Sequence, residues 1–415
     1  MSKKPLSGAH ALPLLSLCGC LLPVAAQAAF VEDSQLTLNA RNFYMNRDFR
    51  NNTAGNHKAE EWGQGFMLRY NSGFTDGPVG FGVDGLGLLG IKLDSGGGTS
   101  RTGALLVERD GNVADEFSFL GLTAKARLAQ SVLTVGTHEP LLPVAYRNDT
   151  RLLPQTFEGA QLVSKDIDKL TLTAGQFRAT RLRDSTDYQD MTMFADGASG
   201  GVQSDRFNYA GAGFAPLINL TATYFYAELE DNYSQHYGNL LYSLPLGEGL
   251  TLKSDIRYFD SSDEGNTTVD NRNLGAMLTL AFKGHALGVA YQDQSGDTGM
   301  PFIAGGTDPW ALNTVTYHHF LRAKEDSWQA RYDYDFAAMG VPGLTLMTRY
   351  VSGDNFTIGG AEAKEWERDV DLGYVIQSGP LKNVGLRLRN VAYRGSHTTD
   401  IDENRVIVNY TVKLW

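Results

Sequence analysis

Apolar and polar side chains alternate with a period of two residues along most of this 415-residue chain. The alternation is clearest in four segments, 79–94, 251–259, 328–335 and 405–414. In the last of these, Val406, Val408 and Tyr410 share one face, and the intervening residues, which include Arg405 and Lys413, share the other. Because successive side chains of a strand point to opposite faces, this pattern predicts β-strands with one apolar and one polar face.

Short clusters of turn-forming residues separate these segments. Roughly 30 to 57 residues lie between consecutive clusters, enough for two strands of about ten residues and one longer loop. Eight such turns joining nine up-and-down units predict 18 strands. The predicted turns are Asp76-Gly77-Pro78, Ala129-Gln130, Asp166-Ile167-Asp168, Ala215-Pro216, Leu246-Gly247-Glu248-Gly249, Lys283-Gly284, Val341-Pro342-Gly343 and Ser378-Gly379-Pro380.

The predicted apolar faces combine aliphatic centres with Tyr, Trp and Phe near their ends, which is typical of the aromatic girdles of outer-membrane barrels. A soluble β-sandwich or β-solenoid would also alternate, but its strands would be shorter and closer together, and no single core could bury so many apolar faces. The final strand is apolar and ends at Trp415, which suits outer-membrane insertion. We therefore expect an all-β transmembrane antiparallel β-barrel of 18 strands.

The segments that connect strands at the end opposite the short turns are long and rich in Gly, Asn, Asp and Ser. The longest intervals contain residues 96–116, 180–206 and 293–326. Long extracellular loops of this kind can fold inward and narrow a pore.

The amino terminus has the pattern of a secretory signal peptide. Lys3 and Lys4 precede an apolar run, and Ala26-Gln27-Ala28 forms a cleavage site. We expect residues 1–28 to be the signal peptide and residues 29–415 to form a single barrel. Leu17-Cys18-Gly19-Cys20 resembles a lipoprotein cleavage box, but the apolar run continues beyond it, which disfavours a lipid anchor. Both cysteines precede the cleavage site, so the mature chain has no thiol for a disulfide or a Cys-based metal site.

Several short motifs do not have the context that their chemistry needs. A G-x-G-x-x-G pattern at residues 80–85 does not open a helix, and a G-x-S-x-G pattern around Ser199 lies in a glycine-rich loop. His318-His319 and the acidic residues 184, 187 and 190 lack the spacing of a zinc or calcium site. The formal net charge of −11 also argues against nucleic-acid binding. We therefore expect no cofactor, no metal and no nucleic-acid partner.

Arginines gather on one predicted wall of the barrel. Arg387 and Arg389 are two residues apart on one strand and therefore both face the lumen. Arg405 takes the same face of the next and final strand, and barrel closure brings that strand beside the first, which ends near Arg47. Four arginines thus converge. An ordinary polar lumen, in which each arginine pairs with Asp or Glu, remains the alternative interpretation.

At these residues the mature chain resembles the porin D family, the outer-membrane carboxylate channels of Pseudomonas and its relatives. The resemblance covers essentially the whole mature chain. It rests on Phe30-Val31-Glu32-Asp33-Ser34, Arg41-Asn42-Phe43-Tyr44-Met45-Asn46-Arg47-Asp48, residues 80–94, Arg151-Leu152-Leu153-Pro154-Gln155-Thr156, Ala227-Glu228-Leu229-Glu230-Asp231, Ser327-Trp328-Gln329-Ala330-Arg331-Tyr332-Asp333, Gly340-Val341-Pro342-Gly343-Leu344-Thr345 and Val375-Ile376-Gln377-Ser378-Gly379-Pro380. It implies an 18-stranded barrel in outer-membrane lipid and lipopolysaccharide, as a monomer or loose trimer, with inward-folded loops and a ladder of basic side chains that leads carboxylates through a constriction.

The family ladder corresponds to five arginines of this chain, Arg47, Arg151, Arg387, Arg389 and Arg405. Two other ladder positions depart from the pattern: Ala59, next to Lys58, and Gly373 replace basic residues. The mature chain is shorter than the basic amino-acid channels of the family, as in the branch for cyclic or aromatic carboxylates. We also single out Asp308, in the seventh long loop, as a carboxylate that could bind the positive part of a zwitterion.

The resulting expectation is a substrate-specific porin, not an enzyme, for passive, facilitated diffusion of small carboxylates such as aromatic or cyclic acids or amino acids. Two other possibilities remain open from the resemblance, a general diffusion porin without substrate preference and a structural barrel with a plugged lumen. An outer-membrane hydrolase would need a nucleophile and base in one site, and we find no coherent Ser, His and acid set.

Overall fold

A computed structural model describes residues 30–415 except 53, 54, 56 and 98. The expected signal peptide, residues 1–28, lies outside the described residues. So do both cysteines and the expected first mature residue, Ala29. Within the described part, no helix has both the length and the hydrophobicity needed to span a membrane.

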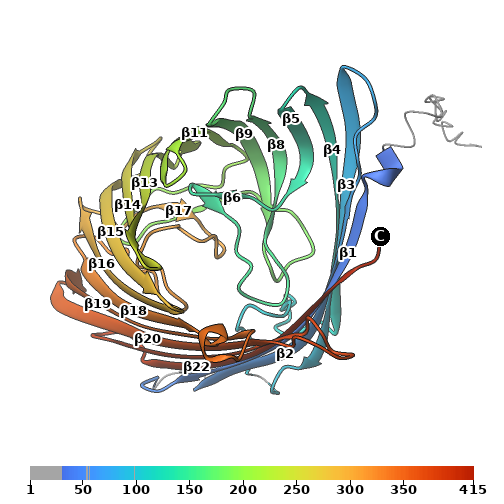
Figure 1. The fold of residues 1–415 in the computed structure, drawn as a ribbon. Helices are drawn as coiled ribbons and strands as arrows, with labels where there is room; N and C mark the ends of the chain where they lie inside the picture. The colour runs from blue at the N-terminus through green and yellow to red at the C-terminus, as the bar shows by residue number, and fades with distance from the viewer. Residues whose placement is uncertain (1–29, 53–54, 56, 98) are drawn as a thin grey trace, which may run out of the picture.

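The chain forms a closed antiparallel barrel of 18 strands, viewed down its axis in Figure 1, which confirms the strand number predicted from the turns. Each strand pairs with its neighbours in chain order, and the first strand closes the ring by pairing with the last. The barrel strands are β1 (Gln35–Phe49), β2 (Lys58–Asn71), β3 (Val79–Asp94), β4 (Glu116–Leu128), β5 (Ser131–His138), β8 (Thr156–Ser164), β9 (Leu170–Arg181), β11 (Phe207–Leu217), β12 (Leu220–Leu229), β13 (Tyr233–Gly247), β14 (Leu250–Asp263), β15 (Asp270–Phe282), β16 (His285–Ser295), β18 (Asp326–Asp335), β19 (Leu344–Ile358), β20 (Ala361–Val375), β21 (Gly385–Gly395) and β22 (Ile401–Lys413).

The remaining elements are short. A 3-10 helix, η1 (Phe336–Met339), leads into the turn before β19. Four two-residue strands lie in the long loops and pair with one another: β6 (Leu141–Leu142) with β7 (Ala145–Tyr146), and β10 (Met193–Phe194) with β17 (Phe302–Ile303).

Seven of the eight predicted turn clusters lie at the short connections between barrel strands. The remaining predicted turn, Ala215-Pro216, is wrong, because both residues lie within β11. There the pairing with β12 shifts register between Phe214 and Leu217. The chain turns instead at Ile218 and Asn219. Proline has no N–H to donate to the ladder, and such an irregularity is where a strand tolerates it.

The two faces of the strands separate as the alternation predicts. Leu386 and Leu388 are exposed on the outside of β21, whereas Arg387 and Arg389 line an internal cavity. Phe81 and Leu120 are likewise exposed, at 58% and 73%. In an outer-membrane barrel this outer face meets lipid.

Four long segments connect barrel strands, 95–115 (of which residue 98 is not described), 139–155, 182–206 and 296–325, and parts of them run inside the barrel, where Figure 1 shows β6 and β17. Segment 139–155 is an addition to the three long intervals noted in the sequence. Two buried apolar clusters include loop residues and inward-facing wall residues. One contains Leu105 and Leu152 of the loops together with Phe43, Met45 and Leu86 of the wall. Part of the lumen face is therefore apolar, because it binds the inward loops.

Candidate functional site: an arginine-lined lumen

Glu61 on β2 holds loop 95–115 against the wall. This buried carboxylate accepts hydrogen bonds from the backbone N–H groups of Arg101 at 2.8 Å, Ala104 at 3.1 Å and Leu105 at 3.3 Å, and from the Thr102 hydroxyl. Each of these four donors loses its hydrogen bonds to water when the loop is buried, and the Glu61 carboxylate replaces them. Glu61 therefore fixes the position of the loop. Glu61 was not identified from the sequence.

Loop 139–155 is held by two ion pairs to the wall. Glu139 forms a bidentate pair with Arg69 at 2.8 Å for both hydrogen bonds, and Asp149 pairs with Arg41 at 2.7 Å. This segment looks like an ordinary connection in the sequence, yet it enters the lumen because its acidic residues meet arginines of β1 and β2.

Arg151, at the end of this loop, lies between two inward loops. Its Nε donates to the Thr102 carbonyl at 2.9 Å and its Nη1 to the Thr150 carbonyl at 3.1 Å. Among the described residues it forms no ion pair with a carboxylate. Burial, followed by repulsion from other arginines, places its pKa well below the usual value.

Arg405 and Arg47 share one buried carboxylate, Glu403. The distances are 2.5 Å from Arg405 and 2.7 Å from Arg47. Arg405 also donates to the backbone carbonyls of Thr150 at 3.3 Å and Thr316 at 3.2 Å. Its side chain is only 1% exposed, so Arg405 joins two inward loops to the wall and offers little surface to the pore.

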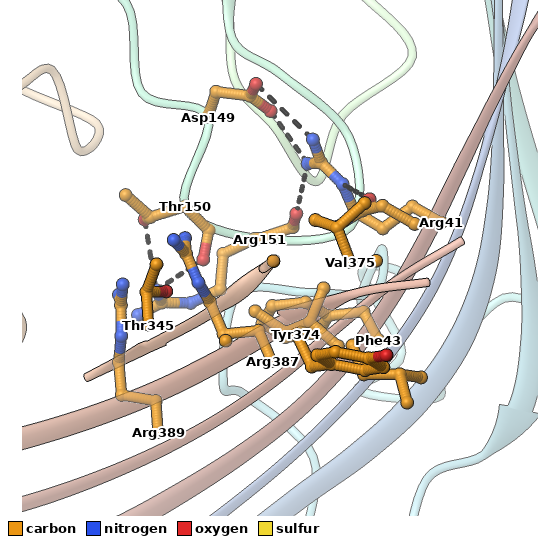
Figure 2. Close-up of a pocket in the computed structure, with 16 residues that line it drawn as sticks. Arg41, Phe43, Asp149, Thr150, Arg151, Thr345, Tyr374, Val375, Arg387 and Arg389 are labelled. Atoms are coloured by element: carbon orange, nitrogen blue, oxygen red, sulfur yellow. Dashed lines mark hydrogen bonds and ion pairs between the residues drawn. The ribbon is translucent and has the colours of Figure 1, made fainter. Parts of the chain in front are cut away.

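Arg387 and Arg389 share a second carboxylate, Asp371 on β20. The ion-pair distances are 3.0 Å for Arg387 and 2.6 Å for Arg389. Their exposure differs, because 53% of the Arg387 side chain is accessible but only 18% of the Arg389 side chain. Figure 2 shows both arginines rising from the wall toward the loop that carries Thr150. Arg387 is thus the ladder arginine with the most accessible side chain.

An acidic column on β20 runs beside the arginines and was missed in the sequence. It consists of four consecutive inward-facing carboxylates, Glu365, Glu367, Asp369 and Asp371, all buried. Their spacing of two residues is the signal that identifies such a row.

The two ends of this acidic column have different partners. Glu367 accepts from the backbone N–H groups of Tyr317 at 2.9 Å and His318 at 2.8 Å, so it fixes loop 296–325. Asp369 pairs with Arg349 at 2.6 Å, and Asp371 pairs with the two arginines of β21. The carboxylates therefore anchor a loop at one end and orient arginines at the other.

Two cavities meet at Arg387 and Arg389. The first has a volume of about 540 Å³ and the second about 520 Å³. They share Thr150, Thr345, Arg387 and Arg389. A solute that moves between them therefore passes the guanidinium groups of β21.

Asp308 lines the second of these cavities, which also contains Arg387 and Arg389. Its carboxylate accepts from the Trp310 backbone N–H at 2.8 Å, and its own N–H donates to the Tyr146 carbonyl at 3.0 Å. Burial raises the pKa of this carboxyl group. The structure thus brings Asp308 and the two β21 arginines to the same cavity.

The two departures from the family ladder have clear structural positions. Ala59 is buried and pairs in register with Arg47, whereas Lys58 is exposed and forms an ion pair with Glu60. Adjacent residues of a strand face opposite ways, so Lys58 does not substitute for the missing lumen side chain. Gly373 lies opposite Arg387 and leaves room beside it in the first cavity.

The ladder arginines outnumber the carboxylates that they share. Arg47, Arg151, Arg387, Arg389 and Arg405 carry five positive charges, and Glu403 and Asp371 carry two negative charges, so 5 − 2 leaves a surplus of three. Outside the ladder, Arg349 is matched by Asp369, whereas Arg41 shares Asp149 with Arg147.

The other motifs remain outside this site. Ser199 Oγ lies 3.4 Å from Thr268 Oγ1 and forms no hydrogen bond to a histidine or carboxylate of the described chain. Within residues 30–415, apart from the four positions not described, no group of three or more His, Cys, Asp or Glu could hold a metal ion.

Comparisons with known proteins place this geometry in a family. Residues 28–414 match the family described as outer membrane porin, OprD family. The porin-like protein GalP of Pseudomonas putida is 39% identical over 97% of this chain and 98% of its own. Among solved structures, OpdQ of Pseudomonas aeruginosa is 48% identical with a TM-score of 0.86, covering 94% of this chain and all of its own. OpdK of the same species, solved with vanillate, is 38% identical with a TM-score of 0.86, covering 93% of this chain and all of its own.

These matches confirm the resemblance noted in the sequence, the outer-membrane location and the expectation of a channel rather than an enzyme. The 18-stranded barrel is thus that of a porin, and the chain belongs to the OprD family of outer-membrane porins.

Proposed function

We propose that this porin mediates passive, facilitated diffusion of small carboxylates and that the arginine ladder provides their path. The observation that carries the proposal is the accessible guanidinium of Arg387 at the junction of two cavities. Its Nε is engaged by Asp371, which leaves its terminal N–H groups for a solute. A guanidinium binds a carboxylate through charge-assisted hydrogen bonds, each contributing about 1.5–3 kcal/mol.

Weak binding at several steps favours passage over trapping. Arg387 and Arg389 are separated by about 7 Å along the strand, the rise of two residues. Because Asp371 competes for both guanidinium groups, each step holds an anion less tightly than a free arginine would. The positive surplus of the ladder still favours an anion over a cation at each step.

We further propose that aromatic carboxylates are among the substrates. The related channel OpdK was solved with vanillate, which is an aromatic carboxylate. In the present chain, Gly373 leaves open volume beside Arg387 within the cavity of about 540 Å³, enough to admit a small ring. Asp308, on the second cavity, is the group that we propose for contact with a positive or hydrogen-bonding part of the solute.

The test is the single-channel current of the purified porin in planar bilayers. Benzoate and an amino acid are added in turn to the wild type and to the Arg387→Ala/Arg389→Ala variant. We expect interruptions of the current by one carboxylate class, and we expect them to disappear in the variant. A large current that is indifferent to both ligand and mutation would identify a general porin instead. Complete absence of current would favour a plugged structural barrel.

A further inference from the structure

Arg368 lies on the lipid-facing side of β20, at a depth where other strands carry an apolar residue. Its chain neighbours Glu367 and Asp369 are buried on the lumen side, so Arg368 faces outward. It is two residues closer to the periplasmic end of the strand than Trp366, an outward ring of the outer aromatic girdle. The outward residues in the same place below three other girdle rings are apolar: Ala330 below Trp328, Val289 below Tyr291 and Ile256 below Tyr258.

The chain supplies no counter-charge for Arg368. An arginine on the lipid face of a barrel is destabilising, and more so the deeper it lies in the bilayer. Arg368 is only partly buried, and it forms no hydrogen bond, ion pair or ring contact with the described residues. The outward carboxylate in the same hydrogen-bonded row, Asp402, is two strands away and already pairs with Arg394 and Arg50.

Two further donors without a protein acceptor share this face of β20. Lys364 is two residues to the outer side of Trp366, and its exposed ammonium group has no partner in the described part of the chain. The Trp366 indole N–H likewise donates to no described group, whereas the indole of Trp62 on β2 donates to Asn42 at 2.9 Å. Lys364 and Arg368 are separated by about 13 Å along the strand, so their long side chains can meet over Trp366.

The surface around these donors is fixed by contacts between rings. The Trp366 ring stacks on Tyr350 of β19 with centroids 5.6 Å apart, and Tyr350 contacts Trp328 of β18 at 5.4 Å. On the other side, the Arg394 guanidinium lies 5.8 Å from the Trp366 ring and is held by Asp402 at 2.7 Å. The tryptophan therefore has a fixed position between the two free cations.

Carboxylates near the patch do not neutralise it. Glu362 is two residues to the outer side of Lys364, and Asp354 lies at the register shift of β19 across from Lys364. Neither has an oxygen within the 4.0 Å of an ion pair with Lys364. Other outward arginines near the outer end, such as Arg178 and Arg272, do have a carboxylate at that distance.

We propose that Arg368, Lys364 and the Trp366 indole bind one phosphate of lipid A, the phosphorylated glycolipid anchor of lipopolysaccharide in the outer leaflet. The inference is independent of the solute that the pore carries. Guanidinium and ammonium groups both bind phosphate, the first through two parallel N–H donors. The depth fits a headgroup, because aromatic girdles mark the boundary between acyl chains and headgroups. Below Arg368, the outward residues Val370 and Leu372 continue as an apolar surface for the acyl chains.

The experiment measures lipid binding to the purified porin in detergent by native mass spectrometry. The probes are bisphosphorylated lipid A and the same lipid after enzymatic removal of its phosphates. We expect the wild type to bind one lipid A about 10- to 100-fold more tightly than the Lys364→Gln/Arg368→Gln variant does. The dephosphorylated lipid should bind both proteins equally and weakly, and excess inorganic phosphate should not displace lipid A.

The matched control is Arg178→Gln, which removes an outward arginine from β9 while Asp205 keeps Arg206 as a partner at 3.7 Å. We expect it to bind lipid A as the wild type does. Wild-type single-channel conductance in the double variant would show an intact barrel, since neither side chain faces the lumen.

Three outcomes would overturn the inference. Equal affinity of the wild type for lipid A and its dephosphorylated form would do so without any variant. Displacement of lipid A by inorganic phosphate would identify a site for small anions instead. A changed oligomeric mass of the double variant, with unchanged affinity for lipid A, would assign this face to a contact between copies of the chain.

Discussion

Replacing Glu61 by glutamine should loosen the constriction, because this carboxylate fixes loop 95–115 through four hydrogen bonds. Oε2 accepts from Thr102, Ala104 and Leu105, and Oε1 accepts from Arg101. A glutamine can keep one oxygen toward the first three donors, but its amide nitrogen then faces the Arg101 N–H. One hydrogen bond is lost, and the acceptor of the other three changes from a charged to an uncharged oxygen.

The size of the effect follows from these bonds. Hydrogen bonds to a charged group contribute about 1.5–3 kcal/mol and neutral ones about 0.5–1.5 kcal/mol. Weakening three and losing one amounts to about 4.5–7.5 kcal/mol, and the lower desolvation cost of an uncharged amide offsets part of this. We expect a net loss of about 2–4 kcal/mol in loop docking, a shift of about 30- to 1,000-fold in the docked population.

The assay is the single-channel conductance and the open-channel noise in planar bilayers. We expect Glu61→Gln to give a higher mean conductance and larger fluctuations, because Thr102 also accepts from Arg151 and both would become mobile. Glu60→Gln is the matched control, since Glu60 is on the opposite face of the same strand and pairs with Lys58. Wild-type conductance and noise in Glu61→Gln would refute the reasoning and assign loop docking to the apolar contacts of Leu105 and Leu152 alone.

Three further predictions concern the lumen. Gly373→Lys should lower the conductance and lengthen benzoate interruptions, because a Cβ there meets only Thr345 Oγ1, at 2.9 Å, and the lysine would extend into the cavity beside Arg387; unchanged interruptions would contradict the assigned ladder position. Burial raises the pKa of Asp308 above the usual aspartate value of about 3.9. As the pH falls, Asp308 therefore loses its negative charge at a higher pH than an ordinary aspartate does. Interruptions by benzenesulfonate, which stays ionised, should therefore lengthen over that pH interval in the wild type and not in Asp308→Asn; the same pH dependence in both proteins would exclude Asp308 as its source. Finally, the benzoate association rate should fall between about 0.1 M and 1 M salt, because the Debye length shrinks from about 10 Å to 3 Å; a rate indifferent to salt would argue against electrostatic guidance.

The alternation and the turn clusters were sufficient to predict the barrel because both are local. A period of two assigns each side chain to the lumen or the lipid, and a short turn fixes which strands are neighbours. For the same reason the sequence placed Arg387 and Arg389 on one face and brought Arg405 and Arg47 to the same wall. The one misplaced turn, at Pro216, reflects a bulge, which depends on pairing with the next strand.

The state of each lumen side chain was decided only by the tertiary structure. Arg405 contacts Thr150, 255 residues away in the sequence, and Thr316, 89 residues away, so its role in joining loops is invisible to any local pattern. The inward course of segment 139–155 likewise depends on Arg41 and Arg69 of distant strands. Strand geometry fixes the direction of a side chain, whereas its accessibility and pairing depend on which loops fold over it, and loop docking is set by contacts that closure of the whole barrel creates.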